Sequence, residues 1–329
     1  ALAASMPGRS VFTGTPRLAE RPHAPLFRAL ELERSGWPVQ VLGREPRQTY
    51  AVECALSSQY ASALVLASCH TLQVTGRPCA VELVGPVASR GYLDVTVRWA
   101  RAAGFDVDAQ PQRIEVRAHR EVEALPAVPP DWSSLGYLML IALASGGEVD
   151  ARGAMEHPDR ALLGHLDVQS RDGQLSVRGA ATPLDADVAA APDLAPTLAA
   201  LALAGRGTSV LRNVEVLRHK ESDRLDGVLA LAGAVGGGAR NEGGVLWLTP
   251  PPRRPARFQL DCRDDHRMTL SAVSLACLLG CRAELSSTRG VDKSFPGFFA
   301  QAEAAGVRFD DAAAVQLARP VGAPVAALA

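Results

Sequence analysis

The segment Ser57–Arg117 decides the fold, and it opens with the apolar run SSQYASALVLAS at residues 57–68. Its small apolar residues predict a helix, and Leu93, Val97 and Ala100 recur at the spacing of one helical face. Gly104 then ends that second helix. The predicted order is helix, strand, helix and two strands, with the first helix at 61–68 and the strands at 80–84, 105–108 and 113–117.

The same pattern recurs along the chain. Full copies begin near Ser57, Ser133, Asp193 and Asp264, at intervals of 76, 60 and 71 residues. The third copy predicts helices at 198–204 and 221–234 and strands at 209–211, 239–241 and 245–248. Strands interleaved with helices indicate an α/β protein.

A partial copy precedes the full ones. Residues 1–5 are interpreted as the tail of a helix, 10–13 as a strand and 22–32 as the second helix. We therefore expect the first unit to be incomplete, either because an N-terminal portion is missing or because a natural variant has a shortened unit. The proline-rich stretch 126–130 predicts a boundary between a domain at 1–128 and a domain at 129–319, followed by a tail at 320–329.

The amino-acid composition argues against several classes of binding partner. Its 329 residues are 47% apolar with a net charge of −1, which favours a two-domain globular protein without bulk attraction for nucleic acid or anionic lipid. Its apolar stretches are far shorter than the ~20 residues that cross a bilayer. Six cysteines without a CxxC pair favour reduced thiols in the cytoplasm, and we assign no metal ligands.

Lysine is nearly absent, which draws attention to two positions. Of 34 basic residues, only Lys220 and Lys293 are lysines. An ammonium that is retained in such an arginine-rich chain suggests that its chemistry is needed. Arg224 and Arg267 lie beside carboxylates, and arginine binds carboxylate and phosphate with a bidentate fork. These groups together predict a substrate with more than one negative charge.

Polar residues also gather where the predicted helices begin. Ser57, Ser58 and Asp193 precede apolar helices, whose N-termini suit phosphate or carboxylate groups. Simple helix capping is the alternative for these three residues. His266 is either a contact to the ligand or a packed histidine at a helix start.

Three ordered motifs resemble the signatures of the 5-enolpyruvylshikimate-3-phosphate synthase family. They are LRHKESDRL at 217–225, DHRM at 265–268 and KSFP at 293–296. Shorter supporting matches occur at 14–17, 20–22, 57–59, 89–94 and 192–193.

The resemblance implies an α/β fold of two domains, an inside-out α/β barrel of repeated βαβαββ units with the first unit missing here. It implies transfer of the enolpyruvyl group from phosphoenolpyruvate to the 5-hydroxyl of shikimate 3-phosphate, in the pathway to chorismate and the aromatic amino acids. Phosphate is released, and no metal or organic cofactor takes part. The implied partners are these two small molecules, without nucleic acid or membrane, and the implied state is a monomer.

The resemblance also implies roles for single residues. Asp193 would accept the proton of the 5-hydroxyl, and Glu221 would act as acid and base at the methylene carbon. The residues implied to bind shikimate 3-phosphate are Ser57, Ser58, Gln59, Ser89, Tyr92, Asp193 and Lys220. Those implied for phosphoenolpyruvate are Arg21, Gln59, Arg224, His266, Arg267 and Lys293, the last also being counted as catalytic.

Two motifs of the family have no counterpart here: a Pro-Gly-Ser-Lys-Ser-type loop and a Gly-Asn-Ala-Gly-Thr-type stretch. Both would precede residue 1. Two alternatives to the shikimate enzyme therefore remain, a non-catalytic remnant that only binds ligands and a transferase for another phosphorylated alcohol.

Overall fold

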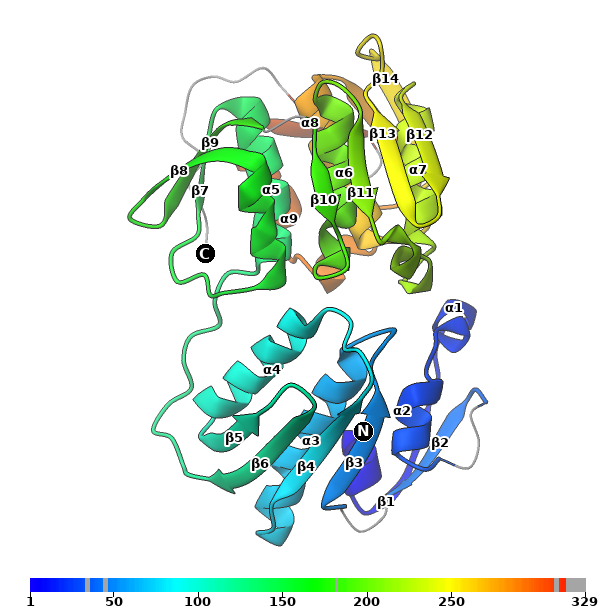
Figure 1. The fold of residues 1–329 in the computed structure, drawn as a ribbon. Helices are drawn as coiled ribbons and strands as arrows, with labels where there is room; N and C mark the ends of the chain where they lie inside the picture. Colours follow the sequence, from blue (N-terminus) through cyan, green and yellow to red (C-terminus); the bar gives the residue numbers. More distant parts are fainter. Residues whose placement is uncertain (33–35, 44–46, 181–182, 311–313, 318–329) are drawn as a thin grey trace. The chain divides into compact units, whose positions relative to one another are not determined.

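The chain forms two compact units, Ala1–Val128 (unit 1) and a second that begins at Pro129 (unit 2). The computed structural model describes residues 1–32, 36–43, 47–180, 183–310 and 314–317 (Figure 1). The predicted tail at 320–329 lies outside the described residues.

Unit 1 contains one complete βαβαββ unit and a smaller two-stranded part. The complete unit comprises β3 (Thr49–Glu53), α3 (Gln59–Thr75), β4 (Cys79–Val84), α4 (Arg90–Ala102), β5 (Phe105–Ala109) and β6 (Arg113–His119). Its sheet has the order β3-β4-β6-β5, with β3 and β4 parallel and the other pairs antiparallel. The smaller part comprises η1 (Leu2–Ser5), β1 (Gly8–Phe12), α1 (Pro16–Glu20), α2 (Ala24–Ala29) and β2 (Val39–Gly43).

The pattern of unit 1 returns twice in unit 2 with the same strand order. One copy comprises β10 (Asp185–Asp187), η3 (Pro192–Leu194), α6 (Ala195–Ala204), β11 (Ser209–Arg212), η4 (Val214–His219), α7 (Arg224–Ala234), β12 (Gly238–Glu242) and β13 (Val245–Thr249). The other comprises β14 (Arg257–Leu260), α8 (His266–Leu279), β15 (Arg282–Leu285), η5 (Val291–Lys293), α9 (Phe298–Ala304), β16 (Val307–Asp310) and β17 (Ala314–Leu317). Their sheets have the orders β10-β11-β13-β12 and β14-β15-β17-β16. The predicted repeat is therefore present, and each complete copy begins with a strand that the pattern from residue 57 onward left out.

The remaining copy in unit 2 differs from the others. It comprises α5 (Trp132–Ser145), β7 (Glu148–Asp150), η2 (Pro158–His165), β8 (Leu166–Arg171) and β9 (Gln174–Ala180). The repeat predicts a second α-helix here, but the structure has the 3-10 helix η2. Pro158 opens this segment and Gly164 lies near its end, so only five residues lie between the two.

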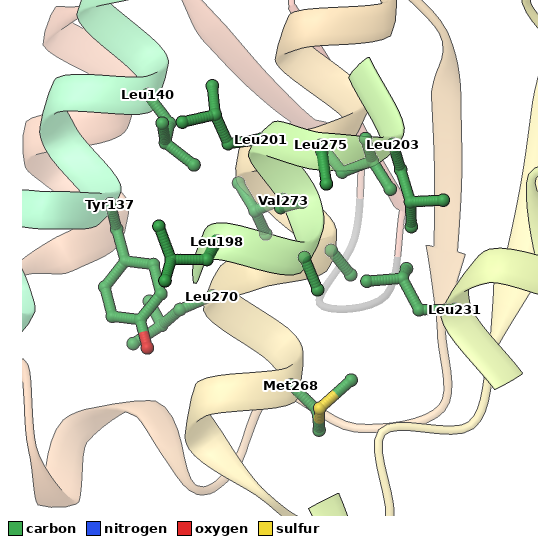
Figure 2. Close-up of a cluster of buried hydrophobic side chains, with 14 of the residues drawn as sticks. Tyr137, Leu140, Leu198, Leu201, Leu203, Leu231, Met268, Leu270, Val273 and Leu275 are labelled. Carbon is green, nitrogen blue, oxygen red and sulfur yellow. The ribbon is translucent and has the colours of Figure 1, made fainter. Parts of the chain in front are cut away.

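The core of unit 2 is built around three helices. Every residue of α6 from Ala195 to Leu203 is buried, as expected of a helix that is apolar on all sides. Figure 2 shows Leu198 and Leu201 of α6 beside Tyr137 and Leu140 of α5 and Val273 of α8. The helices α5, α6 and α8 pack against one another, and each also packs against strands of its own sheet. Helices in the interior and sheets around them give the predicted inside-out arrangement, and this packing holds the starts of α6 and α8 close together.

Candidate active site

Asp193 lies at the centre of a group of charged residues in unit 2. It belongs to η3, the 3-10 turn that leads directly into α6. Its carboxylate accepts from Lys220 Nζ at 3.0 Å and from Arg224 Nη1 at 2.8 Å, and Arg267 Nη2 reaches its other oxygen at 3.2 Å. No side chain caps η3 or α6, so Asp193 is an ion-pair centre and the capping alternative for it is wrong.

Arg224 connects Asp193 to two further carboxylates. Its side chain is only 1% exposed, although it begins helix α7. Nη1 donates to Asp193, Nε donates to Asp265 at 2.9 Å and Nη2 donates to Glu221. A buried guanidinium requires such partners, because the desolvation of an unpaired charge is costly. Arg224 therefore organises the site from within the core.

Asp265 is a functional position to which the sequence reasoning gave no role, although it lies in the DHRM motif. Its side chain is fully buried and caps α8 by accepting from the Arg267 backbone N–H at 2.9 Å. The other oxygen accepts from Arg224 and from Ser222 Oγ at 2.9 Å. Asp265 thereby links the start of α7 to the start of α8. An acidic residue directly before an apolar helix was the available signal.

The charges change the pKa of several groups in the cluster. Burial would raise the pKa of Asp193, but Arg267, Lys220 and Arg224 outweigh burial and hold it well below its usual range. Burial is likewise outweighed at Glu221, whose pKa is lowered mainly by Arg224. At Arg267, the neighbouring Asp193 outweighs burial and raises the pKa. Both carboxylates are therefore ionised and both arginines charged near neutral pH.

His266 and Lys293 lie beside this cluster with less contact to it. Burial lowers the pKa of His266, and the positive charge of Arg267 adds to this shift. Lys293 is an exposed residue of η5, and no ion pair joins it to the described residues of unit 2. Its segment nevertheless packs on the start of α8, since a Cβ on Gly290 would lie 2.9 Å from the Asp264 carbonyl oxygen.

A second group of predicted residues gathers in unit 1, where α3 and α4 begin. Ser58 Oγ donates to the Ser89 carbonyl oxygen at 3.1 Å, which joins the two helix starts. Ser57 Oγ accepts from the Gln59 backbone N–H at 3.2 Å, a local bond of the capping kind. The backbone N–H of Tyr92 donates to Ser89, whose φ of 51° lies in the left-handed region.

Arg21 is held near this group by a bond that the sequence did not reveal. The Tyr60 hydroxyl, in the first turn of α3, donates to the carbonyl oxygen of Pro22. Arg21 forms the end of α1, and its charge acts on the pKa of Tyr60. The structure thus brings the predicted site residues of unit 1 to the starts of α3 and α4. In unit 2 it brings together Asp193, Lys220, Glu221, Arg224 and Arg267, whereas Lys293 makes no ion pair with the described residues of that cluster.

The chain is similar to known proteins in sequence and in fold. The sequence model of the family "EPSP synthase (3-phosphoshikimate 1-carboxyvinyltransferase)" matches residues 1–301. A 3-phosphoshikimate 1-carboxyvinyltransferase from Methanopyrus kandleri is 31% identical over 327 residues, covering 93% of this chain and 74% of the relative. One from Syntrophobacter fumaroxidans is 32% identical over 332 residues, covering 91% and 75%.

Solved structures show the same fold. An EPSP synthase from Acinetobacter baumannii superposes with a TM-score of 0.66 at 22% identity, over 92% of this chain and 75% of that one. The enolpyruvyl transferase NikO from Streptomyces tendae gives 0.64 at 16% identity, over 96% and 76%. The resemblance predicted from the three motifs is confirmed, and the chain belongs to the EPSP synthase family, the 3-phosphoshikimate 1-carboxyvinyltransferases.

Proposed function

We propose that this chain transfers the enolpyruvyl group of phosphoenolpyruvate to the 5-hydroxyl of shikimate 3-phosphate and releases phosphate. The hydroxyl oxygen bonds to C2 of phosphoenolpyruvate while C3 gains a proton. The resulting adduct loses phosphate from C2 and the added proton from C3, which restores the double bond. The observation that carries this proposal is the Asp193 carboxylate within 3.2 Å of three cationic side chains.

Asp193 is the general base for the 5-hydroxyl in this proposal. A strongly lowered pKa makes a carboxylate a weak base, so Asp193 needs relief from its cations before it accepts a proton. An anionic substrate supplies that relief, because the carboxylate and phosphate of phosphoenolpyruvate compete with Asp193 for Arg267. Binding of phosphoenolpyruvate therefore raises the pKa of Asp193 toward its ordinary value and prepares the base only when the substrate is present.

Glu221 exchanges the proton at C3. Its side chain is 44% exposed, and Arg224 holds it from the buried side. A carboxylate anchored in this way faces ligand and solvent with a fixed orientation. Arg224 itself contributes positive charge to the phosphoenolpyruvate site from within the core.

The remaining residues bind the two substrates. Ser57, Ser58 and Ser89 hold the shikimate phosphate at the paired starts of α3 and α4, where the positive ends of the helix dipoles favour anions. Gln59, Tyr92 and Lys220 orient the ring and its hydroxyls. The anionic groups of phosphoenolpyruvate are bound by Arg21, His266, Arg267 and Lys293, with Gln59 nearby.

We further propose that the protein works as a cytoplasmic monomer. All six cysteines are free and buried, as suits a reducing compartment. Among the described residues, no helix combines the length and apolar character needed to span a membrane.

Phosphate release tests the function. The chain is mixed with phosphoenolpyruvate and shikimate 3-phosphate, alone and after fusion to the N-terminal segment of a family member that carries the lysine loop. We expect turnover in at least one form, and Asp193→Ala is expected to lower kcat by about 10²–10⁴-fold while phosphoenolpyruvate still binds. Arg267→Lys keeps the charge but loses the fork, so it should weaken phosphoenolpyruvate binding.

The matched control is Asp185→Ala, which removes an exposed carboxylate paired with Arg212 in the same unit. It should leave both kcat and binding unchanged. Binding of both substrates without phosphate release in either form would instead identify a binding-only remnant. Binding of phosphoenolpyruvate without shikimate 3-phosphate would indicate another acceptor alcohol.

A further inference from the structure

Two buried polar atoms in unit 2 lack a well-formed hydrogen bond. The Tyr137 hydroxyl and Arg267 Nε are both enclosed, and within the described part of the chain neither makes a bond of good geometry, although the two side chains lie within interaction distance of each other. They belong to neighbouring groups, because each side chain acts on the pKa of the other. A buried hydroxyl that is left unsatisfied costs about 1–3 kcal/mol. The hydroxyl of Tyr137 therefore needs a physical reason to be present at this buried position.

Tyr137 is placed by the core rather than by the surface of the site. It lies within α5 and is 1% exposed, and Figure 2 shows its ring packed beside Leu198 and Leu270. Ser274 Oγ on α8 donates to its backbone carbonyl oxygen at 3.4 Å, which joins α5 to the helix that carries Arg267. Phenylalanine would occupy the same space, so packing alone does not account for the hydroxyl.

Arg267 has one N–H donor, Nε, that does not bond to Asp193. Its Nη2 donates to the Asp193 carboxylate at 3.2 Å and its Nη1 donates to the Asp193 backbone oxygen at 3.4 Å. The bond to the carboxylate is longer than the about 2.7–2.9 Å usual for an arginine with a carboxylate, and the bond to the backbone oxygen is longer still. Nε is buried and makes no hydrogen bond of good geometry to the described residues. The guanidinium is therefore held by long bonds at its two Nη atoms and by none at Nε.

We propose that Tyr137 is a positioning residue for Arg267 in the substrate complex, an inference that rests on the proposed function. When an anionic group of phosphoenolpyruvate replaces Asp193 at the Nη atoms, the guanidinium moves and Nε–H donates to the Tyr137 hydroxyl. The hydroxyl proton then points to Thr197, which lies beside it in the first turn of α6. The bond fixes the guanidinium plane for bidentate contact with the ligand.

The charge states suit this exchange. Burial raises the pKa of Tyr137, so the hydroxyl stays protonated and offers both a lone pair and a donor. Arg267 keeps its positive charge because Asp193 outweighs burial in raising its pKa. No proton has to be gained or lost when the bond forms.

The test compares Tyr137→Phe with wild type and with Tyr50→Phe, using the full chain in the form that binds substrate. Tyr50 is likewise a buried tyrosine, 4% exposed, but it lies on β3 in unit 1 with Thr71 as its neighbour. Calorimetry measures the Kd of phosphoenolpyruvate at saturating shikimate 3-phosphate and the Kd of shikimate 3-phosphate alone, and thermal unfolding gives Tm.

For Tyr137→Phe we expect phosphoenolpyruvate to bind about tenfold more weakly, the effect of one lost hydrogen bond to a charged group. Shikimate 3-phosphate should bind within twofold of wild type, and Tm should be equal or higher because an unsatisfied hydroxyl is removed. Tyr50→Phe should leave both affinities unchanged.

Two results would overturn the inference while leaving the proposed function intact. One is a phosphoenolpyruvate affinity of Tyr137→Phe within twofold of wild type. The other is an equal loss of both ligands with a lower Tm, which would make the hydroxyl structural. Failure of wild type itself to bind phosphoenolpyruvate would overturn the proposed function, and this inference with it.

Discussion

The two units gather their polar residues in different ways. In unit 1 they are hydroxyls and backbone groups at the starts of α3 and α4, joined by the bond from Ser58 to Ser89. In unit 2 they are charged side chains, and the site already contains its own anions, Asp193 and Asp265. A ligand adds to the first kind of site, whereas it must replace a partner in the second.

This difference has an energetic meaning. Hydroxyl donors and helix termini are satisfied by water when no ligand is present, so they cost little. A guanidinium that is 1% exposed, such as that of Arg224, is tolerated only because carboxylates compensate it. We therefore expect that unit 2, unlike unit 1, depends on its functional charges for stability.

The largest difference in stability between the two units is expected for Arg224→Met. It leaves the fully buried Asp265 and the Asp193 carboxylate without their shared partner, so unit 2 should lose about 3–5 kcal/mol of unfolding free energy. Hydrogen exchange followed by mass spectrometry should show lost protection in α7 and α8 and unchanged protection in α3. Arg212→Met, which removes an exposed pair with Asp185, should cost less than about 1 kcal/mol. Equal effects of the two variants would contradict the role of Arg224.

Low pH should destabilise unit 2 more than unit 1, by a smaller amount than Arg224→Met does. The pKa of Asp265 is lowered because Arg224 and Ser222 outweigh burial, and that of Asp193 is lowered by its cations. A carboxylate whose pKa is lowered in the folded state stabilises the fold at pH values above its pKa in the unfolded chain, near 4. This stability is lost as the pH falls below that value. Burial lowers the pKa of His266, so the folded state also loses stability as the pH falls below about 6.5, the pKa of histidine in the unfolded chain.

We expect unit 2 to lose on the order of 2–3 kcal/mol between pH 6 and pH 3. In unit 1 the pKa of Glu115 is also lowered, by Arg117, but this pair lies at the surface and is screened by solvent. Hydrogen exchange at both pH values, corrected for the intrinsic rate, compares α8 with α3. A parallel loss in both helices would remove the distinction between the units.

The smallest effect is expected in unit 1. Ser58→Ala removes the bond to Ser89, which should cost about 1 kcal/mol and weaken shikimate 3-phosphate binding several-fold. Ser62→Ala is its control, since Ser62 accepts from Thr96 at 2.9 Å one turn further along the same two helices. The control should lower Tm similarly but leave calorimetric binding unchanged. Equal weakening by both variants would show that helix pairing, not the Ser58 position, matters.

Much of the fold could be predicted because its signals are local. Capping residues before apolar runs, Gly104 after a helix and alternating strands all lie within a few residues of the element that they define. The strands before each helix, such as β3 and β10, were missed because they are short and precede the polar cluster at which each predicted copy begins. The prediction of a second α-helix in the Trp132 copy was wrong, since the short segment from Pro158 to His165 forms a 3-10 helix instead.

The repeat, the family and the residue types of both sites follow from the amino-acid sequence, since motifs and spacing are properties of the chain alone. Which charges meet depends instead on how the repeats pack. Asp193 and Arg267 are 74 residues apart, and only the packing of α6 on α8 brings them to 3.2 Å. That Arg224 is buried, that Asp265 joins two helix starts and that Tyr137 faces Arg267 also depend on packing between repeats. Long-range contacts of this kind leave no periodic mark in the sequence, because each residue satisfies its local pattern equally well with or without its partner.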